Sequence, residues 1–343
     1  MTSGGVYVNA PQDARFANCG VSMNAIGKSS VVFVTLSGLF WGGWALGSQT
    51  PEGQEALARA YATYAQQQAT ANEDLFNTTA LRAIVCGGTS VDQGDSKPCL
   101  AVVAAGRMFI VDAGSGAADT LSARNIPMGR LEAVLLTSAG LAQTADLDEL
   151  YGASARTREN ALLPVYGPAE TQRMVDGLNQ AAGFDGASNG LQAWGPSPEP
   201  GRSVIVFEGD GLIVSAFTTQ EDAFTGRVGY RFDYRGRSIV VGGDGRVVGA
   251  PAAVNADVVL QGAQSQALAR LHDTGQATAA EIAAQARASN TGLVVLTGAD
   301  NQVAAQVQVA EARAAGFEDV VAVRVGMLVE LPLDNSDINV RPL

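Results

Sequence analysis

Short apolar segments bounded by glycine and proline recur from residue 81 to residue 325, and they restrict the fold more than any other feature. Segments of this kind predict strands, and apolar residues at helical spacing predict the helices between them. Residues 183–201, rich in Gly, Ser and Pro, predict a loop. Two sets of strands with their own helices predict an α/β (α+β) protein, a four-layer αββα sandwich. The expected strands are 81–86, 100–104, 108–112, 133–137, 203–207, 212–215, 228–234, 238–241, 257–260, 293–296 and 320–325, and the expected helices are 169–182, 278–288 and 303–315.

Two local signals support particular boundaries within this pattern. Arg235-Gly236 separates two of the expected strands and is typical of a tight hairpin turn. Thr278 is followed three residues later by Glu281, which is the spacing of a capping box at a helix start.

A different kind of segment precedes the strands. Residues 29–48 carry no charge and are about long enough to span a bilayer, with Trp41 and Trp44 toward the end. They predict a hydrophobic transmembrane helix or a signal segment, and a buried core helix is less favoured. If Met23 is the start, Lys28 leads a short signal peptide; if Met1 is, residues 1–28 are a tail. The flanking charges favour a globular domain on the exported, extracytoplasmic side.

The remaining boundaries follow from this division. Residues 49–80 predict a helical stalk, residues 81–332 the globular domain, and residues 333–343 a C-terminal tail. Cys86 and Cys99 fall on strands expected to be neighbours. An exported protein would permit a disulfide between them, and two buried thiols are the alternative.

Charge and residue counts exclude several classes of protein. Lys and Arg total 22 against 34 Asp and Glu, a net charge of −12, which argues against nucleic-acid binding by phosphate neutralisation. Three cysteines cannot form a disulfide scaffold or a four-thiolate zinc site. The single histidine, His272, excludes every histidine-rich metal centre.

Several motifs then occur in a fixed order. They are Gly87-Gly88-Thr89, Phe109–Gly116, Leu135-Leu136-Thr137, Val165-Tyr166-Gly167-Pro168 and Gly229–Asp244. In this order and spacing the chain resembles the metallo-β-lactamase fold family over about residues 81–330, in its ribonuclease Z and arylsulfatase-like branch. The resemblance implies two zinc ions held by histidines and aspartates. It also implies a structural role for Asp112, behind the metal site.

The metal ligands that the resemblance implies are nearly all replaced. One residue, Asp244, matches the family's bridging aspartate, and Glu221 is a second carboxylate at a histidine position. Neutral hydroxyls and amides are poor zinc ligands, and Gly and Ala offer no side-chain donor. We therefore expect no metal cofactor. The degenerate ligand positions are Ser138, Gly140, Ala142, Gln143, Glu221, Asp244 and Gly298.

Few chemically active residues remain. Asp244 and His272 are the two weak catalytic candidates; His272 resembles the family's His-Thr element near the substrate, and a surface histidine is an equal alternative. Asp146, Asp148 and Glu149 follow the degenerate motif, where they predict either a relocated cation site with oxygen ligands or a solvated helix start.

These observations lead to three hypotheses about function. The first is a non-catalytic pseudoenzyme of the metallo-hydrolase type that binds a ligand or partner at the membrane. The second is an active hydrolase with a non-standard oxygen-ligand site. The third is a membrane-linked structural or assembly protein. The loss of ligands favours the first or third, because chemistry depends on the site rather than on the fold. The expected partners are the membrane, through residues 29–48, and a protein partner or a second copy of the chain.

Overall fold

The structure, a computed structural model, describes residues 50, 51, 54, 55, 58, 59, 72–87, 98–156, 161–219, 226–245, 247, 251–271, 276–299 and 301–343. The chain divides into two compact units, Met1–Gln67 and Gln68–Leu343. In the first unit, Arg59 forms an ion pair with Glu55 one helical turn earlier, at 2.6 Å. The hydrophobic segment expected at 29–48 lies outside the described residues. Within the described part of the chain, no helix has the length and apolar character needed to cross a bilayer.

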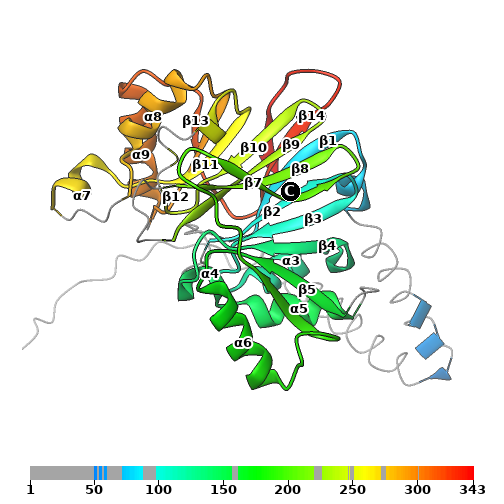
Figure 1. The fold of residues 1–343 in the computed structure, drawn as a ribbon. Coiled ribbons are helices and arrows are strands. Elements are labelled where there is room, and N and C mark those ends of the chain that lie inside the picture. The colour runs from blue at the N-terminus through cyan, green and yellow to red at the C-terminus, as the bar shows by residue number, and fades with distance from the viewer. Residues whose placement is uncertain are drawn as a thin grey trace, which may run out of the picture. The chain divides into compact units, whose positions relative to one another are not determined.

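Two sheets form the centre of the second unit (Figure 1). Among the described residues, the first sheet has eight strands in the order β15-β14-β1-β2-β3-β4-β5-β6, and the second has seven in the order β13-β12-β11-β10-β9-β8-β7. The strands are β1 (Ala80–Val85), β2 (Leu100–Ala104), β3 (Arg107–Val111), β4 (Leu131–Leu135), β5 (Leu162–Tyr166), β6 (Gly190–Trp194), β7 (Ser203–Gly209), β8 (Leu212–Thr218), β9 (Val228–Tyr234), β10 (Arg237–Val241), β11 (Val258–Gly262), β12 (Leu293–Thr297), β13 (Val320–Ala322), β14 (Met327–Pro332) and β15 (Asn339–Pro342).

Helices cover the outer face of each sheet (Figure 1). Helices α3, α5 and α6 contribute buried side chains to a core with the first sheet, and α8 and α9 do so with the second. The described helices are η1 (Glu73–Phe76), α3 (Ala117–Ala123), η2 (Met128–Arg130), α4 (Leu141–Thr144), α5 (Leu147–Ala155), α6 (Thr171–Ala182), η3 (Pro251–Ala253), α7 (Gln266–Leu271), α8 (Ala279–Ala288) and α9 (Gln302–Ala314).

A separate apolar core lies between the two sheets, and it follows from strand alternation. On β1, Leu81, Ala83 and Val85 contact side chains of the second sheet, whereas Ile84 faces the helices. Successive side chains of a strand point to opposite faces, so a strand buried on both faces joins two cores. The four layers predicted from the sequence are therefore present in the order helix, sheet, sheet, helix.

The predicted turn and cap are both confirmed. Arg235 and Gly236 have φ of 48° and 88°, which gives the two left-handed residues that a tight hairpin between β9 and β10 requires. At the start of α8, Thr278 accepts a hydrogen bond from the Glu281 backbone and the Glu281 side chain accepts one from the Thr278 backbone. Both features depend on neighbouring residues alone.

Two regions differ from the sequence prediction. β6 lies within residues 183–201, which were expected to form a loop, and it pairs with β5 in parallel. β15 lies within residues 333–343, which were expected to be a tail, and it pairs with β14 as an edge strand of the first sheet. β15 is exposed along its whole length, so it has no apolar pattern to reveal it. Backbone pairing with a neighbouring strand makes both segments strands.

Candidate functional site

The ends of six strands, three from each sheet, meet at one edge of the sandwich. Parallel strands β3, β4 and β5 of the first sheet end here, as do β10, β11 and β12 of the second. In sheets of this kind the loops beyond the carboxyl ends of the strands form the usual binding site. These loops carry Asp112, Asp244 and Gly298, which line one cavity, and Thr137, whose hydroxyl bonds Asp112.

Asp112 is the most deeply buried carboxylate of the site. It follows β3 with a left-handed φ of 59° and is 3% exposed. Its carboxylate accepts hydrogen bonds from the Thr137 backbone at 2.8 Å and from the Thr137 hydroxyl at 2.8 Å and 3.1 Å. Burial raises the pKa of Asp112 to about 7; the bonds from Thr137 oppose this rise, and the nearby charge of Asp244 adds to it. These contacts join the ends of β3 and β4.

Gln143 is the last residue of the degenerate motif, Thr137–Gln143. Its side-chain Nε2 donates a hydrogen bond to Oδ2 of Asp244 at 3.0 Å, and its residue is buried. Its carbonyl accepts a bond from the backbone of Ala113 at 2.7 Å, which holds α4 against the residue after Asp112. Nearby, Oγ of Ser138 accepts a bond from the backbone of Gly140 at 3.3 Å. Hydrogen bonds to Asp244, Ala113 and Gly140 therefore hold the residues of this motif in place.

The glycines of the site differ in what surrounds them. Gly243 has φ of 55°, and an added Cβ would lie 2.5 Å from Oγ1 of Thr137. The space beside Gly245 is taken by the buried hydroxyl of Thr219, since an added Cβ there would lie 2.0 Å from it. Gly298 has φ of 86° but is roomier, with 3.6 Å to the nearest atom. Of these three positions, only that of Gly298 has room for a side chain, and its left-handed φ would strain the backbone of any other residue.

Two zinc ions do not fit the donors at these positions. An amide N–H of Gln143 points at Asp244, where a metal ion would need a lone pair, and a proton donor cannot act as a ligand. Gly140, Ala142 and Gly298 have no side-chain donor. Across the described residues, no three His, Cys, Asp or Glu side chains are grouped so as to hold a metal ion. Glu221 and His272 lie outside the described residues.

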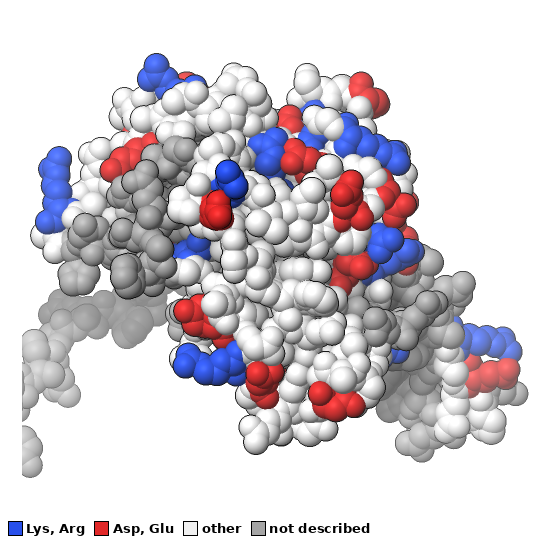
Figure 2. Space-filling model, viewed as in Figure 1, with Lys and Arg blue, Asp and Glu red and all other residues white. Residues whose placement is uncertain are grey.

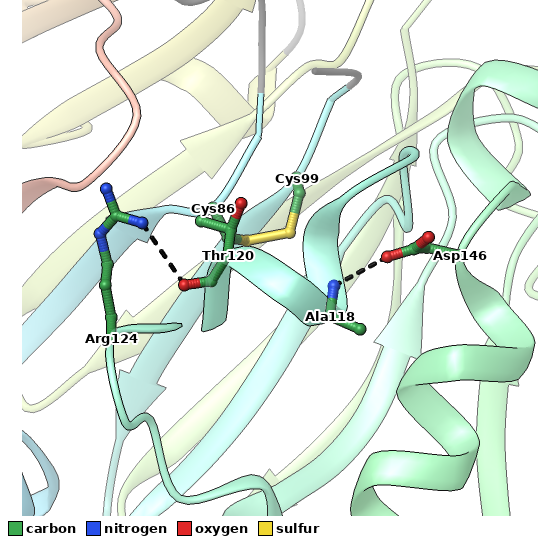
Figure 3. The surroundings of a disulfide bond; sticks show 6 residues. All are labelled: Cys86, Cys99, Ala118, Thr120, Arg124 and Asp146. Carbon is green, nitrogen blue, oxygen red and sulfur yellow. Dashed lines mark hydrogen bonds between the residues drawn. A yellow bond between two sulfur atoms is a disulfide. The ribbon is translucent and has the colours of Figure 1, made fainter. Parts of the chain in front are cut away.

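The acidic residues after the motif are not grouped around a common point. Asp146 is buried and accepts a hydrogen bond from the backbone of Ala118 at 2.8 Å, at the start of α3 (Figure 3). Asp148 and Glu149 are exposed on the first turn of α5. The charge of Asp146, more than any other factor, raises the pKa of Glu149. Of the two predictions for these acids, the solvated helix start describes Asp148 and Glu149, whereas Asp146 binds a helix terminus.

A disulfide joins Cys86 to Cys99 beside the site (Figure 3). Cys86 follows β1 and Cys99 precedes β2, and their Cα atoms are 5.0 Å apart. The backbone N–H groups of Cys86 and Gly87 both donate to the carbonyl of Cys99, at 3.1 Å and 3.0 Å. The sequence left open a disulfide or two buried thiols, and the structure has the disulfide.

A cavity of about 120 Å³ lies between the two sheets at this edge. Asp112 and Asp244 provide its charged groups, and Cys99 of the disulfide contributes to the wall. Its walls come from strands far apart in the chain, so no local sequence pattern determines its shape. Its apolar walls are Val85, Leu100, Val111, Val241, Leu260 and Val323.

Tyr230 connects the two sheets close to the cavity. It is the central residue of the Gly-Tyr-Arg motif, lies on β9 in the second sheet and is fully buried. Its hydroxyl donates to the carbonyl of Leu136, after β4 of the first sheet, at 2.9 Å. Burial, followed by the charge of Asp112, raises the pKa of Tyr230. The motif therefore holds the sandwich together at the site.

The surface gives no sign of a polyanion-binding face in the view of Figure 2. Lys and Arg side chains are scattered there among Asp and Glu, and the described residues of this face form no continuous basic area. A central area of the same face is uncharged.

Comparison with known proteins places this geometry in a wider context. No family model matches the sequence. Ribonuclease Z of Mycobacterium marinum is 29% identical over 167 residues, which is 46% of this chain and 60% of the relative. Ribonuclease Z of Mycobacterium avium is 26% identical over 167 residues, which again is 46% of this chain and 60% of the relative. The chain thus spans about 60% of the length of these curated relatives.

Solved structures agree on the fold. The metallo-β-lactamase fold protein YhfI from Bacillus subtilis superimposes with a TM-score of 0.59 at 16% identity, covering 73% of this chain and 99% of that one. Human tRNase Z, short form, gives a TM-score of 0.58 at 16% identity, with the same coverage of both chains. The chain therefore has the metallo-β-lactamase fold, in a form similar to the ribonuclease Z branch.

Proposed function

We propose that this protein is a non-catalytic member of the metallo-hydrolase group that binds a ligand or partner without a catalytic metal. The supporting observation is the 3.0 Å hydrogen bond from Gln143 to Asp244. In this bond one carboxylate oxygen of Asp244, the one retained ligand residue, accepts from a proton donor of the protein itself. Hydrolysis in this fold family would need a metal-bound water of lowered pKa. The proposal is further supported by the described residues, among which no three His, Cys, Asp or Glu side chains are grouped so as to hold a metal ion.

The proposed location is the exported side of a membrane. The uncharged segment 29–48 supports an anchor or a signal segment, and the disulfide between Cys86 and Cys99 supports an oxidising compartment, where such bonds persist. Fractionation of cells producing the full chain tests this location. Recovery of an intact, reduced protein in the cytosol would contradict it.

Elemental analysis tests the proposed loss of metal. The full chain, purified without chelators, should carry well under one zinc, manganese or iron ion per molecule. It should hydrolyse neither phosphodiesters nor β-lactams. About two tightly held ions would overturn the proposal and would favour the alternative hypothesis of an oxygen-ligand site that includes Glu221 and Asp244.

A restoration variant makes the same test in the opposite direction. It combines Ser138→His, Gly140→His, Ala142→Asp, Gln143→His, Glu221→His and Gly298→His. Replacing Gln143 removes the donor that faces Asp244 and the oxygen that lies 2.8 Å from an added Cβ at Gly140. The histidine at 298 has to adopt a left-handed φ, at a cost of about 1–2 kcal/mol. Metal binding should appear, and it should disappear again when Asp244→Asn is added as the matched control.

A further inference from the structure

The charges around the cavity are of one sign. Asp112 and Asp244 line it, and among its described lining residues no side chain carries a positive charge. The guanidinium group of Arg227 donates to the backbone carbonyl of Asp244 at 3.3 Å rather than to the carboxylate. A buried carboxylate without a cation is costly, because burial removes its water. The cavity therefore favours an occupant that brings positive charge.

Asp244 also has hydrogen-bonding capacity left for an occupant. Its Oδ2 accepts from Gln143, whereas Oδ1 accepts from no described residue and lies against Gly262, 2.9 Å from where a Cβ would be. An ionised carboxylate accepts bonds through both oxygens. An ammonium group, which has three donors and no acceptor, is complementary to this arrangement.

The rest of the cavity determines the shape of the occupant. Its other walls are mainly Val and Leu side chains, which suit an apolar body rather than a hydrated ion. The volume of about 120 Å³ is close to that of the roughly 150 Å³ apolar cavities that hold one benzene ring. The apolar part of the occupant is therefore about one ring in size.

We propose that this cavity binds a small organic cation, a protonated amine attached to an apolar body of about one ring. The ammonium group lies at Asp112 and Asp244, and the apolar body contacts the valines and leucines between the sheets. This inference rests on the proposed absence of metal, because an ion at Asp244 would occupy the place of the ammonium group.

Three probes of similar shape and different charge test the proposal. Benzylamine, benzyl alcohol and benzoate are titrated into the full chain by isothermal titration calorimetry at pH 8. Benzylamine should bind at least about tenfold more tightly than benzyl alcohol, since hydrogen bonds to a charged group contribute more than neutral ones. Benzoate should not bind. Equal affinities for the three probes, or tighter binding of benzoate, would overturn the proposal.

Variants locate the binding and control for net charge. Asp244→Asn should abolish the preference for the amine over the alcohol, whereas Asp148→Asn, which removes an exposed charge on α5, should preserve it. Val323→Phe narrows the cavity and should weaken the binding of both probes. Benzylamine binding that survives both Asp244→Asn and Val323→Phe would show that the amine binds elsewhere, which contradicts the proposal.

Metal content separates the two proposals. Metal-free protein that does not prefer benzylamine would overturn the amine site alone and leave the proposed function in place. Protein with about two bound zinc ions and no benzylamine binding would overturn both.

Discussion

Replacing Asp112 by Asn should flatten the dependence of stability on pH. In the folded protein burial raises the pKa of Asp112 from 3.8 to about 7, whereas in the unfolded chain the carboxyl is in water and ionises near its ordinary pKa. Between these two pH values the folded state holds a proton that the unfolded state has lost. The stability contributed by this carboxyl is therefore fully present below about pH 3.8 and is lost as the pH rises through about 7.

The magnitude follows from the same two values. The interval of about three pH units corresponds to about 4 kcal/mol of unfolding free energy, at about 1.4 kcal/mol per unit. The isoelectric point is near 4.6, so measurements belong above about pH 5.5, where the chain keeps a net negative charge. From about pH 5.5 to about pH 8 the expected loss is about 2 kcal/mol.

Asparagine is suited to this test because it keeps the local hydrogen bonds. Its amide oxygen can accept from the Thr137 backbone, as the Asp112 carboxylate does at 2.8 Å, and its NH₂ group can donate to the Thr137 hydroxyl. The asparagine has no charge to bury at any pH. The variant should therefore gain stability relative to the natural protein as the pH rises.

Urea denaturation of the full chain with its disulfide intact provides the measurement. Unfolding free energies at about pH 5.5, 6.5, 7.25 and 8 are compared between the natural chain, Asp112→Asn and the exposed control Asp148→Asn. The difference between Asp112→Asn and the natural chain should change by about 2 kcal/mol over this range. A difference that stays constant with pH would show that Asp112 is ionised throughout, and the reasoning from burial would be refuted.

Three further predictions concern stability. Replacing Cys86 and Cys99 by Ser opens a loop with a sequence separation of 13 and should cost about 3 kcal/mol in urea denaturation; an unchanged midpoint would contradict this. Gly243→Ala places a Cβ 2.5 Å from a threonine hydroxyl at a φ of 55° and should cost about 2–4 kcal/mol, whereas Gly236→Ala, at a φ of 88° in open space, should cost only about 1–2 kcal/mol. Arg82→Met removes a buried guanidinium that bonds a carboxylate at 2.8 Å and two backbone carbonyls. It should lower the free energy of unfolding by about 3–5 kcal/mol, seen as a lower thermal midpoint. A loss below about 1 kcal/mol would show that the ion pair of Arg82 does not behave as a buried pair.

The two-sheet architecture could be predicted because it depends on local patterns. The apolar strands, the hairpin turn at Arg235-Gly236 and the capping box at Thr278 are all encoded by residues within a few positions of one another. The resemblance also predicted that Asp112, Gln143 and Asp244 belong to one site, and in the structure Gln143 bonds Asp244. β6 and β15 could not be predicted in this way, because strand pairing with a distant segment supplies what their own side chains do not.

The lack of side-chain donors at Gly140, Ala142 and Gly298 follows from the sequence alone, since glycine and alanine offer no donor in any fold. Which atoms now contact Asp244 was decided by tertiary structure, because Gln143 is 101 residues away in the chain. The same is true of the pKa of Asp112, which depends on burial between two sheets, and of the disulfide, which needed β1 and β2 to be neighbours. The cavity has the same origin. Its walls come from strands that only folding places opposite one another, so its size and lining depend on the tertiary structure.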